Sequence, residues 1–364
     1  MLDSLARKNP STIFVAAASN DGDEGAGYVN SPYKNMNVIS VAALDDATYF
    51  KTVAPTSSYG PNDFYNPISG EIVKGVVSAV DIAAPGTVYT VKANETLGNE
   101  RGTSLAAPIV SSAATLMVSY SKSRGMDAES RDARLIKSIL LNSASKPESW
   151  DNGGGYVDSV SANGKVYNGV FSTSQSLDLH SGAGILNAKQ ALAEYDNFGK
   201  TSFLGEVAKS ESAFYYFDAA GENNVLNATL CWFVGSSVDG VEYDGDGNIS
   251  SIDADASHFA NLDLRLWAAG TDGEYELIAQ SVSDYNNVEH LFINLDKSGS
   301  YALEVYFADM AYGDTESETF ALAWNLAQVP EPAQSAFAAS ILAGALLAVS
   351  KLRGMLKNRG KSAN

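Results

Sequence analysis

The hydrophobic residues of this sequence follow two different patterns, and the change between them near residue 198 constrains the fold more than any other feature. Before that point, continuous apolar runs at 11–18 and 37–43 alternate with helical patterns, such as the apolar stripe over 133–140. Continuous apolar runs are typical of strands buried on both faces of a parallel sheet. We therefore expect residues 1–198 to form an α/β domain in which helices pack on a parallel sheet.

Beyond residue 198, apolar residues occupy every second position. The pattern is clearest at 262–266, 301–307 and 320–326, and turns rich in Gly, Asn and Asp separate these segments. Period-two alternation predicts strands with one buried face, and a succession of such strands favours an antiparallel β-sandwich. We expect this second domain to cover residues 199–328.

Residues 329–364 differ from both domains. An almost wholly apolar segment at 336–349 is followed by a basic cluster, made of Lys351, Arg353, Lys357, Arg359 and Lys361. The apolar segment is shorter than the ~20 residues that usually span a bilayer. The basic cluster after it nevertheless predicts a hydrophobic membrane helix with the C-terminus in the cytoplasm. The alternative is an amphipathic surface helix.

Charge and cysteine content exclude several classes of function. Lys and Arg total 24 against 43 Asp and Glu, a formal charge of −19, so no nucleic acid partner is expected. The single cysteine, Cys231, lies in an apolar run and is expected in the core, and no intrachain disulfide can form. We expect no cofactor and no metal. The segment 244–248 has the composition of a calcium loop but lacks the downstream Glu, which favours a polar hairpin turn.

The segment Gly102-Thr103-Ser104-Leu105-Ala106-Ala107-Pro108 suggests a site for nucleophilic chemistry. Gly102 permits a tight turn that would place Ser104 at the start of a helix, where Pro108 is tolerated in the first turn. Unpaired N–H groups at a helix N-terminus favour an anionic neighbour, as an oxyanion site requires. From spacing alone, a helix that merely begins with a Ser cap and small residues remains the alternative.

The residue identities favour the catalytic interpretation. Residues 102–110 resemble the serine motif of the subtilase family of serine proteases, with Leu105 in place of Met and Ile109 in place of His.

Three further segments match landmarks of the same family in the same order. Residues 15–22 resemble the segment that carries the oxyanion asparagine, which would be Asn20, and Ser19 stands where the family usually has Gly. Residues 81–86 match another landmark, and residues 57–60 match a weaker one. The resemblance covers the chain from its first residue to about residue 195.

The resemblance implies both a fold and a set of site residues. Residues 1–198 would be the C-terminal part of a subtilisin-like catalytic domain. Ser104 would be the nucleophile, and Asn20 together with the backbone N–H of Ser104 would hold the oxyanion. The residues that would line the substrate site are Ala17, Ala18, Ser19 and Gly102.

The family's triad Asp and His both precede the oxyanion asparagine, and this sequence has no His before His180. The other histidines, His258 and His290, lie in the β-region, and all three are expected to be surface or packing residues. Serine without an adjacent base is a weak nucleophile. We therefore expect a chain that lacks the N-terminal part of its catalytic domain and is inactive by itself.

Residues 261–266, 286–290 and 299–305 look like the jelly-roll domain that follows many subtilase domains.

The tail resembles a sorting signal. Residues 329–332, the apolar segment and the basic cluster resemble in order the PEP-CTERM sorting signal of Gram-negative bacteria. This resemblance implies an exosortase that recognises Pro330, Glu331 and Pro332.

Two functions remain open. The leading hypothesis is an exported serine endopeptidase that acts on peptides or proteins and is anchored to the membrane by its C-terminus before processing. The alternative is a non-catalytic cell-surface protein with a remnant protease domain, in which the β-sandwich binds polysaccharide or protein.

Overall fold

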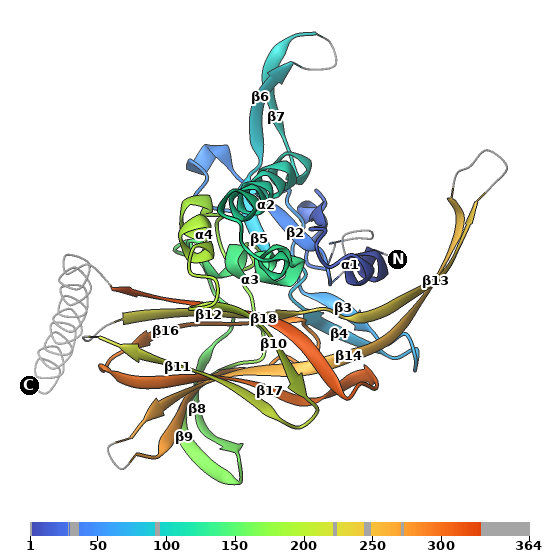
Figure 1. Cartoon of the computed structure of the whole chain (residues 1–364). Helices are drawn as coiled ribbons and strands as arrows, with labels where there is room; N and C mark the ends of the chain where they lie inside the picture. Colours follow the sequence, from blue (N-terminus) through green and yellow to red (C-terminus); the bar gives the residue numbers. More distant parts are fainter. Residues whose placement is uncertain are drawn as a thin grey trace, which may run out of the picture.

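The computed structural model describes residues 2–27, 29, 36–91, 95–220, 224–243, 249–270 and 273–328. The predicted membrane segment 336–349, the motif Pro330-Glu331-Pro332 and the loop 244–248 lie outside these residues. Figure 1 shows helices and a small sheet packed above two larger sheets.

A three-stranded parallel sheet with the order β1-β2-β5 forms the upper part of the chain. Its strands are β1 (Val15–Ala17), β2 (Ile39–Leu44) and β5 (Ile82–Pro85). All six residues of β2 are buried, as expected for a continuous apolar run in a central strand. The parallel sheet predicted for this half is therefore confirmed.

Four helices accompany this sheet (Figure 1). They are α1 (Leu2–Lys8), α2 (Thr103–Arg124), α3 (Ala133–Asn142) and α4 (Ala188–Tyr195), with short 3-10 turns at Gly22–Glu24, Asp46–Thr48 and Ala128–Arg131. Within the described ranges, α2 alone is long and apolar enough to cross a membrane by length and composition. Its buried residues Val110 and Met117 pack in the core cluster of the parallel sheet. The apolar composition of α2 is therefore that of a helix in the protein core.

Two larger sheets form the lower part of the chain, and their strands are antiparallel except for the parallel pair of β9 and β15. The four-stranded sheet has the order β10 (Ser202–Ala208), β18 (Ser317–Gln328), β12 (Asn224–Trp232) and β16 (Val288–Leu295). The seven-stranded sheet has the order β11 (Ser212–Ala219), β17 (Gly299–Gly313), β14 (Ile249–Ala269), β15 (Tyr275–Ser281), β9 (Lys165–Thr173) and β8 (Gly155–Ala162), and β13 (Gly235–Tyr243) pairs with β14.

The two larger sheets share one hydrophobic cluster. Leu230 and Leu322 enter it from the four-stranded sheet, and Leu264 and Val305 enter it from the seven-stranded sheet. The mixed α/β class predicted from the sequence is therefore confirmed. Assignment of this half to the jelly-roll type stays a prediction.

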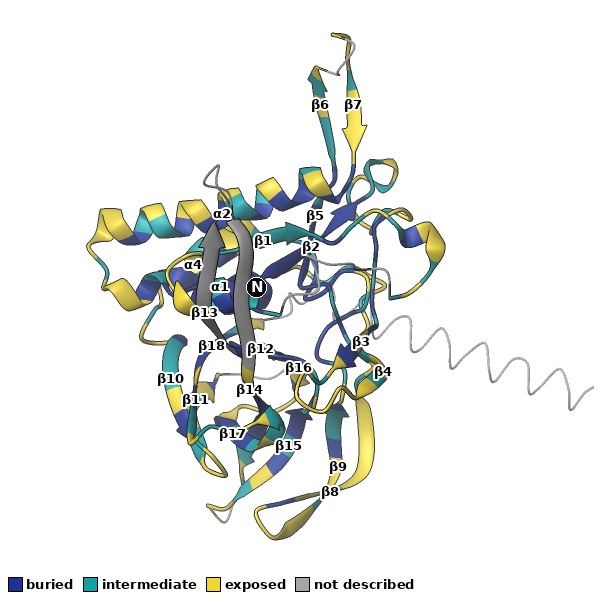
Figure 2. Cartoon of the chain, turned by 90° about the vertical axis from the view of Figure 1, so that its right-hand side faces the viewer, coloured by how far each residue is buried: buried dark blue, intermediate teal, exposed yellow. Residues whose placement is uncertain are grey.

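Three hairpins were not predicted. They are β3 (Asn62–Tyr65) with β4 (Ile72–Val77), β6 (Thr87–Val91) with β7 (Leu97–Arg101), and β8 with β9. The β6–β7 hairpin projects away from the body and is largely exposed (Figure 2). The β8–β9 hairpin joins the seven-stranded sheet, because Phe171 of β9 pairs in parallel with Ala279 of β15.

Strand pairing thus crosses the boundary expected near residue 198. After β9 the chain returns to the parallel sheet, where Ile185 bridges to Ala83 of β5, and α4 follows. The domain limits stay a prediction, but the segment from β8 to β9 belongs by hydrogen bonding to the lower sheet.

Helix α3 lies between the two halves and is buried on nearly every side, with Arg134 alone partly exposed. Its apolar residues pack in one cluster with Ile39 and Ile82 of the parallel sheet and with Cys231 and Ala321 of the four-stranded sheet. Burial raises the pKa of the Cys231 thiol to about 12, in agreement with its predicted role as a core residue.

The polar residues of α3 have partners in both halves. Lys137 forms a buried ion pair with Asp81, with 2.8 Å between Nζ and Oδ1, and also donates to the carbonyl oxygen of Val38 at 3.0 Å. At the other end of the helix, Asn142 donates to Glu194 at 2.8 Å and accepts from Thr229 of β12 at 3.2 Å. Every one of these groups would cost free energy if it were buried without a partner.

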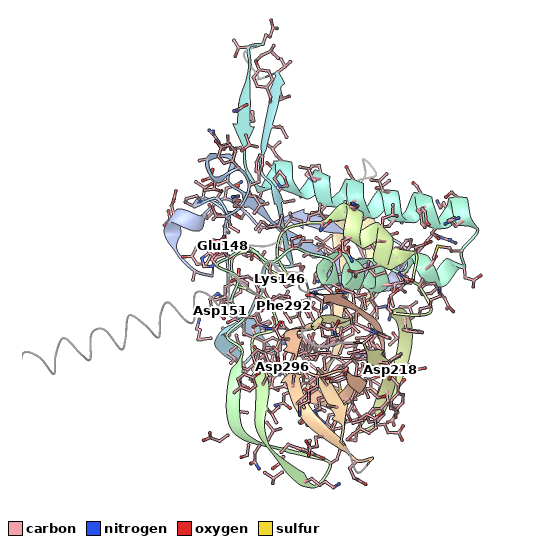
Figure 3. All side chains as sticks on the ribbon, turned by 90° about the vertical axis from the view of Figure 1, so that its left-hand side faces the viewer. Lys146, Glu148, Asp151, Asp218, Phe292 and Asp296 are labelled. Carbon is pink, nitrogen blue, oxygen red and sulfur yellow. The ribbon has the colours of Figure 1, made fainter. Side chains whose placement is uncertain are left out.

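Lys146 is another polar residue between the two halves of the chain. It lies beside Phe292, between the helices and the strands (Figure 3). Its Nζ donates to the carbonyl oxygen of Ala183 at 2.6 Å and lies 5.0 Å from the centre of the Trp150 ring. Burial lowers the pKa of Lys146 to about 7. Burial also lowers the pKa of the neighbouring His290 well below its usual range.

Replacement of Lys137 tests whether α3 depends on its buried ion pair. Lys137→Met leaves the Asp81 carboxylate buried without its cation, so the free energy of unfolding should fall by about 3–5 kcal/mol. Lys74→Met is the control, because Lys74 pairs with Asp63 on the surface at 2.6 Å and its side chain is 78% exposed. Chemical denaturation should show a large loss for the first variant and almost none for the second. Equal effects would contradict a special role for the buried pair.

Candidate active site

The start of α2 places Ser104 at the surface. Gly102 precedes the helix with φ of +150°, a conformation that favours glycine, and its N–H donates to the carbonyl oxygen of Gly86 at 2.9 Å. Leu105 N–H donates back to the carbonyl oxygen of Gly102 at 3.1 Å and closes the first turn. Ser104 is therefore exposed in that turn, and its N–H is one of the first N–H groups of the helix, which have no partner inside it.

Asn20 follows β1 and is tied to the same turn. Its Oδ1 accepts hydrogen bonds from the backbone N–H of Thr103 at 2.9 Å and from the Thr103 hydroxyl at 3.2 Å. Because the amide oxygen is held by Thr103, the amide Nδ2 is the end of the side chain that can donate to a ligand. Among the described residues, neither this Nδ2 nor Ser104 Oγ has a hydrogen-bond partner.

The structure brings the two predicted catalytic groups together around Gly102. A Cβ placed on Gly102 would lie 3.3 Å from Asn20 Oδ1, 3.5 Å from Asn20 Nδ2 and 3.4 Å from Ser104 Oγ. The hydroxyl, the amide and the helix N-terminus therefore surround one small volume that only glycine leaves open. Such an arrangement can present a nucleophile to a carbonyl carbon and donors to its oxygen.

The predicted substrate-site residues Ala17, Ala18 and Ser19 lie at the end of β1 and just beyond it. Ala17 is partly buried, and Ala18 is fully buried in a cluster with Ala42 and Val80, which leaves its backbone rather than its side chain for a ligand. Ser19 has φ of +83°. That value is unfavourable for a residue with a Cβ, and Ser19 stands where the family has Gly. Assignment of these residues to a specificity pocket stays a prediction.

The loop that carries Asn20 is held in place by residues 57–60, which are only a weak match to the family motifs. Ser58 N–H donates to the carbonyl oxygen of Ser19 at 3.0 Å, and Ser58 Oγ accepts from the N–H of Asp21 at 2.9 Å. The Ser19 hydroxyl donates to the Asp21 carboxylate. The landmark at 57–60 thus has a physical role, because it fixes the loop from which Asn20 reaches α2.

No imidazole among the described residues forms a hydrogen bond with Ser104. His180 is exposed and stacks on Tyr59, with ring centres 4.1 Å apart. His258 is buried and bonds to Glu318, and His290 is fully buried with its Nδ1 2.8 Å from the Thr229 hydroxyl. Within the same described ranges, no group of three or more His, Cys, Asp or Glu residues is arranged to hold a metal ion.

Residues 2–164 of the chain match the profile of the subtilase family, peptidase S8. The match ends in the turn between β8 and β9, before the limit near residue 195 that the motifs predicted. It contains Asn20, Gly102 and Ser104. Residues 2–164 therefore resemble a subtilase-type serine protease domain, and the site described above lies inside the matched segment.

Several solved structures resemble the chain in part. The prenylagaramide maturation protease PagA is 25% identical over 52% of each chain, with a TM-score of 0.34. The self-cleaved protease domain of PatA is 23% identical over 53% of each chain, with a TM-score of 0.35. Tripeptidyl peptidase 2 is 14% identical, with 89% of this chain and 33% of that chain covered and a TM-score of 0.32. The chain spans about half the length of the first two structures.

Variants at residue 19 test the strain next to Asn20. Ser19→Gly and Ser19→Ala both lose the hydroxyl that bonds to Asp21, but only glycine relieves the positive φ. Ser19→Gly should therefore be more stable than Ser19→Ala by about 1–3 kcal/mol, measured by chemical denaturation. Equal stability of the two variants would show that the backbone at this position is not strained.

Proposed function

We propose that this protein is a serine endopeptidase of the subtilisin type that cleaves peptides or proteins. The observation that carries the proposal is the convergence of Ser104 Oγ and the Asn20 amide around Gly102, inside the segment that matches the subtilase profile. The proposal also includes the export, the membrane anchoring and the exosortase processing that the tail motif at 329–332 suggests. It further assigns a jelly-roll type to residues 199–328, the β-half of the chain.

The geometry supports a two-step acyl transfer. Ser104 Oγ attacks the carbonyl carbon of the peptide bond and gives its proton to a base. The oxyanion receives hydrogen bonds from Asn20 Nδ2 and the N–H of Ser104, which are strongest as the charge develops. The base returns the proton to the leaving amine, and an acyl-serine remains. Water then attacks this ester in the same way and releases the second product and the serine.

The base in this scheme is supplied from outside the described residues. The chain has three histidines, and each is engaged elsewhere, with His258 and His290 buried in the β-half. Among the described residues, β1 is the edge strand of the order β1-β2-β5 and its residues are only partly buried, so a further strand can pair with it. Further sequence of the same protein, or another chain, would pair there and bring the missing imidazole and carboxylate to Ser104.

The test compares the chain as given with the protein made together with any coding sequence that precedes Met1. Casein cleavage and labelling by a fluorophosphonate should be weak in the first and strong in the second, because a serine hydroxyl needs an adjacent base. Ser104→Ala should abolish both signals. Ser112→Ala is the control, since Ser112 is an exposed serine of the same helix that donates to the carbonyl oxygen of Pro108 at 2.7 Å. Asn20→Ala should lower kcat more than it raises KM.

Three results would contradict parts of the proposal. Activity that survives Ser104→Ala would exclude the nucleophile. Equal Ser104-dependent activity in both forms, lost in His180→Ala, would show that the chain contains its own base. Complete absence of activity in the longer form would favour the non-catalytic alternative, a surface protein that binds through its β-half.

A further inference from the structure

A hollow of about 300 Å³ crosses the outer face of the seven-stranded sheet. This aromatic groove is lined by the rings of Tyr167, Phe214, Tyr216, Trp267 and Tyr275. The face is the one opposite the shared core, because Phe214 and Tyr216 alternate along β11 with Ala213, Tyr215 and Phe217, which pack in the core cluster. The groove belongs to a different sheet from the one that Asn20 follows, so its role is separate from the chemistry of Ser104.

Strand register explains why the sheet is hollow here. Tyr216 of β11 lies opposite Ala302 of β17, and Ala302 in turn lies opposite Trp267 of β14. A single methyl group therefore stands between two large rings in one row across the sheet, and it leaves space above the backbone. Neighbouring side chains on one face of a sheet normally fill such a row.

The floor of the groove is a small packed cluster, because Trp267 and Ala302 are buried together, and the other rings stand at its edge. Tyr216 of β11 and Tyr275 of β15 approach each other from the two sides, with centres 6.1 Å apart. Tyr167 of β9 stands on edge against Trp267, with centres 5.3 Å apart. Phe214 is 44% exposed and Tyr216 is 67% exposed. Two exposed rings beside a hollow whose floor is a buried indole favour a binding surface over an ordinary solvated sheet face.

The rim of the groove is polar, and the two charged residues among its described lining have opposite signs. Lys165 of β9 and Glu274 form an ion pair at 3.0 Å, and Asn163 lies beside them. Three of the five rings are tyrosines, so hydroxyl groups are distributed along the walls. A paired rim gives neither an anion nor a cation an advantage, and the chain's formal charge of −19 disfavours anions further.

We propose that this groove binds a neutral oligosaccharide. A pyranose ring presents a face of C–H groups that packs on an aromatic ring, and its hydroxyls need donors and acceptors at the edge of the same site. The groove offers both, in a row that crosses β11, β17, β14, β15 and β9. A wholly apolar peptide would leave the tyrosine hydroxyls, the amide and the ion pair of the rim poorly used. On this basis the β-half attaches the protein to a glycan by binding it in the aromatic groove.

The experiment uses the whole protein and named probes. Pull-down with insoluble cellulose, chitin, curdlan and starch, and calorimetry with the hexasaccharides of the same linkages, should reveal binding to at least one of them. The double variant Phe214→Ala/Tyr216→Ala should weaken that binding at least tenfold, because it removes one wall of the groove. Both side chains are exposed, so the fold should tolerate the change. Tyr89→Ala is the matched control, since Tyr89 is 70% exposed on the β6–β7 hairpin and lies outside the groove.

The proposal predicts that binding is unchanged by Tyr89→Ala and by Ser104→Ala and varies little with salt. A Ser104→Ala variant that loses peptidase activity but still binds sugar would show that the aromatic groove and the candidate active site are separate. Absence of binding to every neutral probe would overturn the inference. So would binding that the double variant leaves intact, or binding restricted to charged polysaccharides and abolished by salt. Capture of apolar peptides by the same rings, with no affinity for sugars, would overturn the ligand class.

Discussion

The burial of α3 on nearly every side is the constraint on which the rest of this structure depends. A helix between two layers must satisfy its polar side chains inside the protein, and α3 carries both Lys137 and Asn142. Lys137 pairs with Asp81 of the parallel-sheet half, and Asn142 bonds to Thr229 of the four-stranded sheet. Since an unpaired buried charge is costly, these partners fix the position of α3 relative to both halves at once.

This constraint also positions the candidate active site. Asp81 accepts from the backbone N–H of Ser40 in β2 at 2.8 Å, so the ion pair holds the central strand of the parallel sheet as well as α3. The site is built at one end of that sheet, where β1 leads to Asn20 and Gly86 bonds to Gly102 at the start of α2. The strained backbone of Ser19 is tolerated because Ser58 and Asp21 brace the loop on either side.

The pattern of apolar residues within a segment predicted those helices and strands whose buried face is set by that segment alone. The strands β1 and β2, the helices α2 and α3, and the alternation in β14, β17 and β18 all agree with the periodicity of the residues. The juxtaposition of Ser104 and Asn20 was predictable too, but from residue identities rather than from spacing. The catalytic roles of these residues remain predictions, as do the tail and its partners.

Features that depend on long-range contacts could not be predicted in this way. Nothing in residues 155–173 shows that β9 pairs with β15, because that contact joins positions about a hundred residues apart. Asp263 and Arg265 alternate with core leucines as solvated residues would, yet both are buried and bond to each other at 2.7 Å. Burial raises the pKa of Asp263 to about 6 despite this cation. The aromatic groove likewise arises from register between strands, which places Ala302 beside two rings.

The central claim is that α3 joins the parallel sheet and the two larger sheets into one cooperative unit. Native-state hydrogen exchange at increasing denaturant measures it most directly. The account predicts that the slowest amides of β2 and of β12 exchange with the same free energy of opening and the same denaturant dependence, because neither half opens alone. If amides of β12 and β17 stay protected while β2 and β5 exchange through a separate, smaller opening, α3 does not couple the two halves and the claim fails.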